Sequence, residues 1–122
     1  MDVTSQVVFD GTHRVVIHLT GISEGENESN VVKVNVSELE PPCLTVTIDK
    51  VSYAVVGGLV ELKWDEYERF AVLTEVGTEL CFSKTGNLVN DVDGSDGNIL
   101  LSTRGFDLNS AYDITLELIK RY

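Results

Sequence analysis

Apolar and polar side chains alternate with a period of two along most of the chain. In the segment 14–20, Val15, Ile17 and Leu19 fall on one side of an extended chain and mostly polar residues fall on the other. Because successive side chains of a β-strand point to opposite faces, this period predicts strands with one apolar face. Such strands are typical of antiparallel sheets that cover a core. The same pattern predicts further strands over the segments 32–36, 44–48, 51–55, 60–64 and 112–118.

Turns that contain glycine or proline separate the predicted strands. Asp10-Gly11 and Gly57-Gly58 each lie between two apolar runs, and both dipeptides favour a β-hairpin turn because Asp and Gly tolerate a positive φ. Pro41-Pro42 ends a strand, since proline cannot donate a hydrogen bond to a ladder. Short strands joined by such turns predict an all-β fold: an antiparallel β-sandwich, of the jelly-roll or immunoglobulin-like type, with little or no helix.

One stretch, residues 65–74, has two interpretations. The spacing of Asp65 and Glu68 matches a helix capping box, which predicts a short helix. The alternative is strand, turn and strand, in which Phe70, Val72 and Thr74 alternate beyond a turn at 66–69. The β-pattern on both sides of the stretch favours the second interpretation.

The length of 122 residues fits one domain with its own core. We expect a single β-sandwich domain over residues 10–122. The segment 1–9 lies outside the clearest alternation. It is predicted to form either a flexible N-terminal segment or a first edge strand.

Charge excludes two classes of partner. The chain carries 20 acidic and 9 basic side chains, a formal net charge of −11. Phosphate binding needs clustered Lys and Arg, so this charge disfavours a nucleic-acid partner and adhesion to anionic lipid. No apolar run reaches the roughly 18–20 residues that span a bilayer, so no membrane partner is expected. An acidic surface also keeps copies of the protein apart.

The acidic loop 91–97 is the candidate for metal binding. Calcium prefers six to eight oxygen ligands, and Asp91, Asp93, Ser95 and Asp96 would supply several. The loop departs from an EF-hand, which needs glycine where Asp96 stands and glutamate where Ser102 stands. We interpret the loop as a solvated hairpin tip, with calcium binding by Asp91, Asp93 and Asp96 as the alternative.

Residue types that support catalysis are present, but their spacing forms no known motif. His13 and His18 are five residues apart, so on one strand they face opposite sides. Cys43 and Cys81 stand alone and are interpreted as buried free thiols. Trp64 shares the parity of an apolar stripe and is interpreted as a core residue. We therefore expect no enzyme activity and no cofactor.

A series of short β-type motifs covers nearly the whole chain. They are RVVIHLTG at 14–21, VVKVNVS at 31–37, LKWD at 62–65, GNILLST at 97–103 and YDITL at 112–116. In this order they resemble a group of small virion structural proteins of tailed bacteriophages, especially phages of aquatic bacteria. The resemblance provides no catalytic residues to carry over.

The resemblance implies a capsid decoration (cement) protein. Such a protein binds the outer surface of the major capsid shell and stabilises the phage head, often as a homotrimer at three-fold positions. It would be made in the host cytoplasm and located on the exterior of the virion. We expect the β-prone residues Gln6, Val7, Val8 and Phe9 to add a strand to a capsid edge. For Lys120 and Arg121 two interpretations are open: contact with an acidic partner, or a frayed terminus.

Two other functions remain open at this point. A head–tail connector or tail-associated β-sandwich would be present in about a dozen copies per virion, and decoration in hundreds. A carbohydrate- or host-binding β-module would use the acidic loops 23–30 and 90–97, because binding loops cluster at one end of a sandwich.

Overall fold

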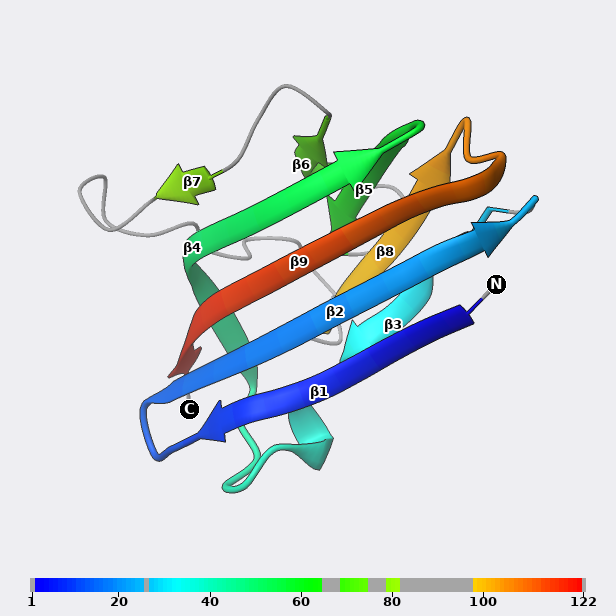
Figure 1. The fold of residues 1–122 in the computed structure, drawn as a ribbon. Coiled ribbons are helices and arrows are strands. Elements are labelled where there is room, and N and C mark those ends of the chain that lie inside the picture. Colours follow the sequence, from blue (N-terminus) through cyan, green and yellow to red (C-terminus); the bar gives the residue numbers. More distant parts are fainter. Residues whose placement is uncertain (1, 26, 65–68, 75–78, 82–97, 122) are drawn as a thin grey trace.

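The chain folds into two antiparallel β-sheets in the computed structural model (Figure 1). The residues described are 2–25, 27–64, 69–74, 79–81 and 98–121. The five-stranded sheet contains, in spatial order, β1 (Asp2–Asp10), β2 (Arg14–Glu24), β9 (Leu108–Arg121), β4 (Thr45–Val56) and β7 (Glu79–Cys81). The four-stranded sheet contains β3 (Val31–Val34), β8 (Ile99–Arg104), β5 (Leu59–Lys63) and β6 (Arg69–Leu73).

The apolar faces of the two sheets enclose the core. The four-stranded sheet lies behind the five-stranded sheet in the view of Figure 1. The predicted stripe of β2 is buried, and so is the facing stripe of β5 with Val60 and Leu62. The stripe of β9 is buried as well and consists of Tyr112, Ile114, Leu116 and Leu118. The predicted antiparallel β-sandwich is therefore confirmed.

Helical structure is minimal in the part of the chain that the structure describes. It contains one 3₁₀-helix, η1 (Val36–Glu38), and no α-helix. The side chain of Asn35 caps η1 by accepting a hydrogen bond from the Ser37 N–H at 3.1 Å. No helix among these residues is long and apolar enough to cross a membrane.

Two β-bulges change which side chains are buried. In β4 the register shifts between Ile48 and Lys50. The buried apolar side chains are therefore even-numbered up to Ile48 and odd-numbered from Val51. In β3 the register shifts between Val32 and Val34; Val34 is buried and Val32 is exposed. A bulge inserts one extra residue on one strand and breaks the period of two. The predicted burial of Val32 is therefore wrong. Leu44, placed in the same stripe as Val46, precedes β4 and is exposed.

The ambiguous stretch ends in a strand. Residues Arg69–Leu73 form β6 and pair with β5 from Leu73 opposite Val60 to Arg69 opposite Lys63. The strand interpretation is confirmed for this part, and residues 65–68 lie outside the described residues. The buried side chains are Ala71 and Leu73, whereas Val72 is exposed.

Gly57-Gly58 does not form a hairpin as predicted. It joins β4 of one sheet to β5 of the other, so the chain crosses between layers here. Gly57 has a φ of 87°, and a Cβ on Gly58 would lie 2.6 Å from the Arg104 carbonyl oxygen. The dipeptide supplies both a left-handed conformation and a close approach between layers.

We expect Gly58→Ala to lower the free energy of unfolding by about 1–3 kcal/mol, because the new methyl group has no space beside backbone. Urea unfolding followed by circular dichroism measures the change. Gly11→Ala is the matched control, since its new Cβ would lie closest to the ring of the exposed Phe9 side chain, at 3.0 Å, and at an ordinary 3.5 Å from the Arg14 carbonyl oxygen. An equal loss in both variants would contradict the explanation.

The N-terminal segment, expected as either flexible or an edge strand, forms most of β1 at the edge of the five-stranded sheet. β1 pairs with β2 from Asp2 opposite Ile22 to Asp10 opposite Val15, with a bulge between Val7 and Phe9. The predicted Asp10-Gly11 hairpin closes this pair, and the Gly11 N–H donates to the Arg14 carbonyl oxygen at 2.8 Å.

Candidate functional site

The predicted capsid-binding residues Gln6, Val7, Val8 and Phe9 lie on the exposed edge strand β1. The three apolar side chains are 51%, 59% and 56% exposed, in that order. One edge of β1 pairs with β2, and no described strand pairs with its other edge. This surface, which we call the β1 edge, presents backbone groups and apolar side chains together.

Lys120 is not part of an exposed basic surface, which corrects the prediction for this residue. Its side chain is 0% exposed, and its ammonium group lies 2.5 Å from Asp10 Oδ1. The same group donates to the Pro41 carbonyl oxygen at 3.0 Å. Lys120 therefore ties the end of β9 to the end of β1. Its neighbour Arg121 is exposed.

The Asp10 carboxylate is held in its charged form. Burial disfavours the charge, but hydrogen bonds from the Lys120 ammonium and the Glu40 N–H, together with the Lys120 charge, outweigh that effect and lower the pKa of Asp10. The Glu40 N–H donates to Oδ2 at 2.8 Å. The pair therefore links the ends of β1 and β9 to the backbone of residues 40 and 41.

The other sequence candidates do not converge. The calcium candidates Asp91, Asp93 and Asp96 lie outside the described residues, as does the side chain of Cys81. Cys43 is a half-buried free thiol, and burial raises its pKa. His18 forms an exposed pair with Asp113 at 2.7 Å. Within the described ranges, no group of three or more His, Cys, Asp or Glu side chains is placed to hold a metal ion.

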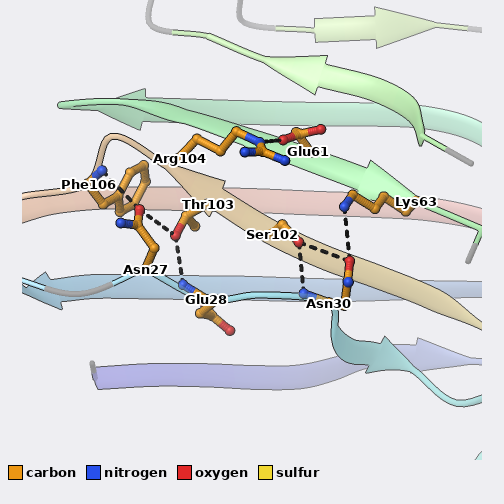
Figure 2. Close-up of polar contacts among 9 residues, drawn as sticks. All are labelled: Asn27, Glu28, Asn30, Glu61, Lys63, Ser102, Thr103, Arg104 and Phe106. Carbon is orange, nitrogen blue, oxygen red and sulfur yellow. Dashed lines mark hydrogen bonds and ion pairs between the residues drawn. The ribbon is translucent and has the colours of Figure 1, made fainter. Parts of the chain in front are cut away.

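A polar pocket of about 500 Å³ lies where residues 27–30 run beside β8 (Figure 2). The backbone of Glu28 pairs with Thr103: the Thr103 N–H donates to the Glu28 carbonyl oxygen at 3.0 Å. The Glu28 N–H donates to Thr103 Oγ1, and the Asn30 N–H donates to Ser102 Oγ, both at 2.8 Å. The segment 27–30, which precedes β3, thus stays attached to β8, through side-chain hydroxyl groups of β8.

Two asparagine side chains border this pocket, and the oxygen atom of each accepts hydrogen bonds from groups of the protein itself. Asn27 Oδ1 accepts from the Phe106 N–H at 3.0 Å and from Thr103 Oγ1 at 3.2 Å. Asn30 Oδ1 accepts from Lys63 Nζ at 3.0 Å and from Ser102 Oγ at 3.2 Å. Backbone and ammonium donors therefore fix the orientation of both amide groups.

The register of β5 against β8 places charged side chains on the outer face of the four-stranded sheet. Glu61 is opposite Ser102, and Lys63 and Arg104 lie one on each side of that pair. Arg104 Nε donates to the Glu61 carboxylate. In Figure 2 the Arg104 side chain ends at Glu61, and the Lys63 side chain ends at Asn30. Glu61 is 2% and Lys63 is 8% exposed, although alternation predicts a solvated face for both.

Glu28 directs its carboxylate away from these groups. It forms an ion pair with Lys33 Nζ at 2.8 Å and accepts a hydrogen bond from the Tyr112 hydroxyl. Burial, together with the hydrogen bond and the charge of Glu28, raises the pKa of Tyr112 far above its usual value. All three side chains are buried or nearly so. This cluster joins β3 to β9 across the two layers.

Sequence reasoning did not identify the pocket. It placed residues 23–30 in an acidic loop and the segment 60–64 in a strand with one apolar face. The signal available was the density of Asn, Ser and Thr in 27–30 and 102–103, but no spacing rule brings these segments together.

Comparisons with solved structures find two cupins. One is an RmlC-like cupin family protein with a double-stranded β-helix fold from Methanocaldococcus jannaschii; it is 11% identical with a TM-score of 0.42, and the match covers 98% of this chain and 82% of that chain. The other is a cupin superfamily protein from Desulfitobacterium hafniense; it is 9% identical with a TM-score of 0.37, and coverage is 99% and 79%. No protein-family profile and no curated protein sequence matches this chain.

Proposed function

We propose that this protein is a structural component that docks onto the outer surface of a larger protein shell through the β1 edge. In the form that the resemblance to phage virion proteins implies, it is a capsid decoration protein whose partner is the major capsid protein. A homotrimer on the virion exterior belongs to the same proposal. Binding only the assembled shell would stabilise that shell by mass action.

The observation that carries this proposal is the exposure of the β1 edge. An unpaired strand edge offers a row of N–H and C=O groups to another chain, and Val7, Val8 and Phe9 add apolar surface beside it. A strand of a partner that pairs there would gain backbone hydrogen bonds and bury these side chains. The net charge of −11 would keep free copies from pairing with each other at the same edge.

The proposal is tested with Val8→Lys, which places a charge on the β1 edge. Val8 has no paired residue in the β1–β2 register, so the fold should tolerate lysine. We expect binding to expanded heads of the virus that encodes the chain to weaken about tenfold or more, because docking would bury the new ammonium group. Co-sedimentation with heads over a range of protein concentrations measures this effect.

Val56→Lys is the matched control, since Val56 is also a strand valine and is 61% exposed on β4, which β2 and β9 separate from β1. It should bind heads like the unmodified protein. Thermal unfolding of both variants checks that the fold is intact. Unchanged binding of a folded Val8→Lys variant would refute docking through the β1 edge.

A further inference from the structure

Lys63 carries a buried positive charge that no described carboxylate neutralises. Lys63 is only 8% exposed, and its ammonium group donates a hydrogen bond to Asn30 Oδ1. The other charges at the pocket are balanced in pairs, Glu61 by Arg104 and Glu28 by Lys33. Among the residues that the structure describes, no carboxylate lies within ion-pair distance of this ammonium group. Because burying an unpaired charge is unfavourable, an anion bound in the pocket would be stabilised by Lys63.

The hydrogen-bonding groups that remain available around Lys63 are mainly donors. The side-chain oxygen atoms of Asn27 and Asn30 are already occupied by internal donors. Their NH₂ groups have no hydrogen-bond partner among the residues that the structure describes. Arg104 uses Nε for Glu61, and its terminal guanidinium nitrogen atoms have no partner in the described part of the chain, on a side chain that is 66% exposed. Amide, ammonium and guanidinium donors match the oxygen atoms of an anion.

We propose that the pocket formed by Asn27, Asn30, Lys63, Ser102 and Arg104 binds an oxyanion: a carboxylate, sulfate or phosphate group of a small polar ligand. The oxyanion would be held by the Lys63 ammonium and the Arg104 guanidinium, which lie on the same sheet face, one on each side of the Glu61–Ser102 pair (Figure 2). It supplies a counter-charge that Lys63 does not find among the described residues, and the pocket volume of about 500 Å³ admits a group larger than the oxyanion itself. The net charge of the chain is −11, which repels anions in general, so the donors of this pocket have to provide the attraction locally.

Nuclear magnetic resonance provides a direct test, because the side-chain NH₂ groups of Asn27 and Asn30 give their own signals in ¹H–¹⁵N spectra. The protein is titrated separately with sodium phosphate, sodium sulfate and sodium glucuronate at a constant ionic strength set with sodium chloride. We expect saturable shifts of these NH₂ signals, and the tightest of the three identifies the source of the oxyanion. Glucose is the uncharged comparison and is expected to cause no shift.

Lys63→Met removes the ammonium group and keeps the length of the side chain. We expect it to weaken oxyanion binding by about tenfold or more, since the charge-assisted contact is lost. Lys50→Met is the matched control: Lys50 lies on β4 of the other sheet and pairs with Glu79 at 3.4 Å, so binding should be unchanged. The titration of the unmodified protein is decisive even if Lys63→Met fails to fold.

Three results would overturn the proposal: no saturable shift with any of the three anions, an equal response to glucose, or unchanged affinity in a folded Lys63→Met variant. The inference is independent of docking through β1, because Lys63 lies on β5 of the other sheet. Loss of head binding in Val8→Lys with intact oxyanion binding, or the reverse, separates the two proposals.

Discussion

Replacing Asp10 with alanine is expected to lower the free energy of unfolding by about 3–5 kcal/mol, because it leaves the buried Lys120 ammonium without its counter-ion. The Lys120 side chain is 0% exposed and lies 2.5 Å from Asp10 Oδ1. After the substitution, the Pro41 carbonyl oxygen would be the hydrogen-bond acceptor that remains from the contacts described above. Urea unfolding at pH 7 measures the loss.

Two comparisons distinguish a buried charge from the general effect of removing an aspartate. Asp49→Ala breaks the ion pair with Arg14, whose side chain is half exposed, and should cost less than about 1 kcal/mol. The double variant Asp10→Ala/Lys120→Met should be more stable than Asp10→Ala, because no charge is left unpaired. Equal losses for Asp10→Ala and Asp49→Ala would contradict the structural role of the pair.

The same pair predicts a dependence on pH. The pKa of Asp10 in the folded protein is below its usual value of 3.8, so the unfolded chain takes up the proton first as pH falls. The stability that Asp10 contributes is therefore present at neutral pH and declines below about pH 4. It is lost once the pH has fallen below the lowered pKa of the folded protein. The stability difference between the unmodified protein and Asp10→Ala should narrow in that range. A difference independent of pH down to pH 2 would contradict this assignment.

Replacing Glu28 with alanine is expected to have an effect of similar size, about 3–5 kcal/mol. The substitution leaves the Lys33 ammonium buried without a counter-ion and the Tyr112 hydroxyl without its acceptor. The damage is expected to extend to both layers, since Glu28 joins β3 to β9. Hydrogen exchange of β3 and β9 amides, together with urea unfolding, measures it. A loss of less than about 1 kcal/mol would contradict this explanation, because it would mean that water solvates the Lys33 ammonium in the variant.

Tyr112→Phe is the companion variant, because it removes the hydroxyl and leaves the Glu28–Lys33 ion pair. We expect a loss of about 1–2 kcal/mol for the hydrogen bond. The raised pKa of Tyr112 means that the unfolded chain releases its phenolic proton first as pH rises above the usual value of 10.0. The contribution of Tyr112 to stability should therefore be full at neutral pH and decrease above about pH 10. Tyr112→Phe should lack this decrease.

Alternation along the chain was sufficient to predict the layers but not every buried side chain. The stripes of β2 and β9 were identified residue by residue, because these strands are long and regular over the stripe. The burial of Val32 was predicted incorrectly because a bulge in β3 shifts the parity of its strand. A bulge inserts one residue and depends on what the partner strand presents, so the period alone does not reveal it.

Turn residues likewise specified where the chain turns, but not which sheet the next strand joins. Asp10-Gly11 and Gly57-Gly58 carry the same local signal, yet the first closes the hairpin of β1 and β2 while the second crosses between sheets. Only the second of these connections uses a positive φ, at Gly57, whereas the Asp10-Gly11 turn closes without one. The choice between them follows from which layer buries the next apolar stripe, and that depends on the whole core.

The sequence by itself determined the period of two, the antiparallel sandwich and the acidic character of the surface, because each is a property of neighbouring residues or of composition. Only the tertiary structure decided that Lys120, Glu28 and Lys63 are buried, since their contacts join segments far apart in the chain. Alternation states which face of a strand a charge occupies, and it does not state whether another segment covers that face. For that reason an edge strand was one of the two predictions for segment 1–9, whereas the donor-lined pocket beside β8 was not predicted at all.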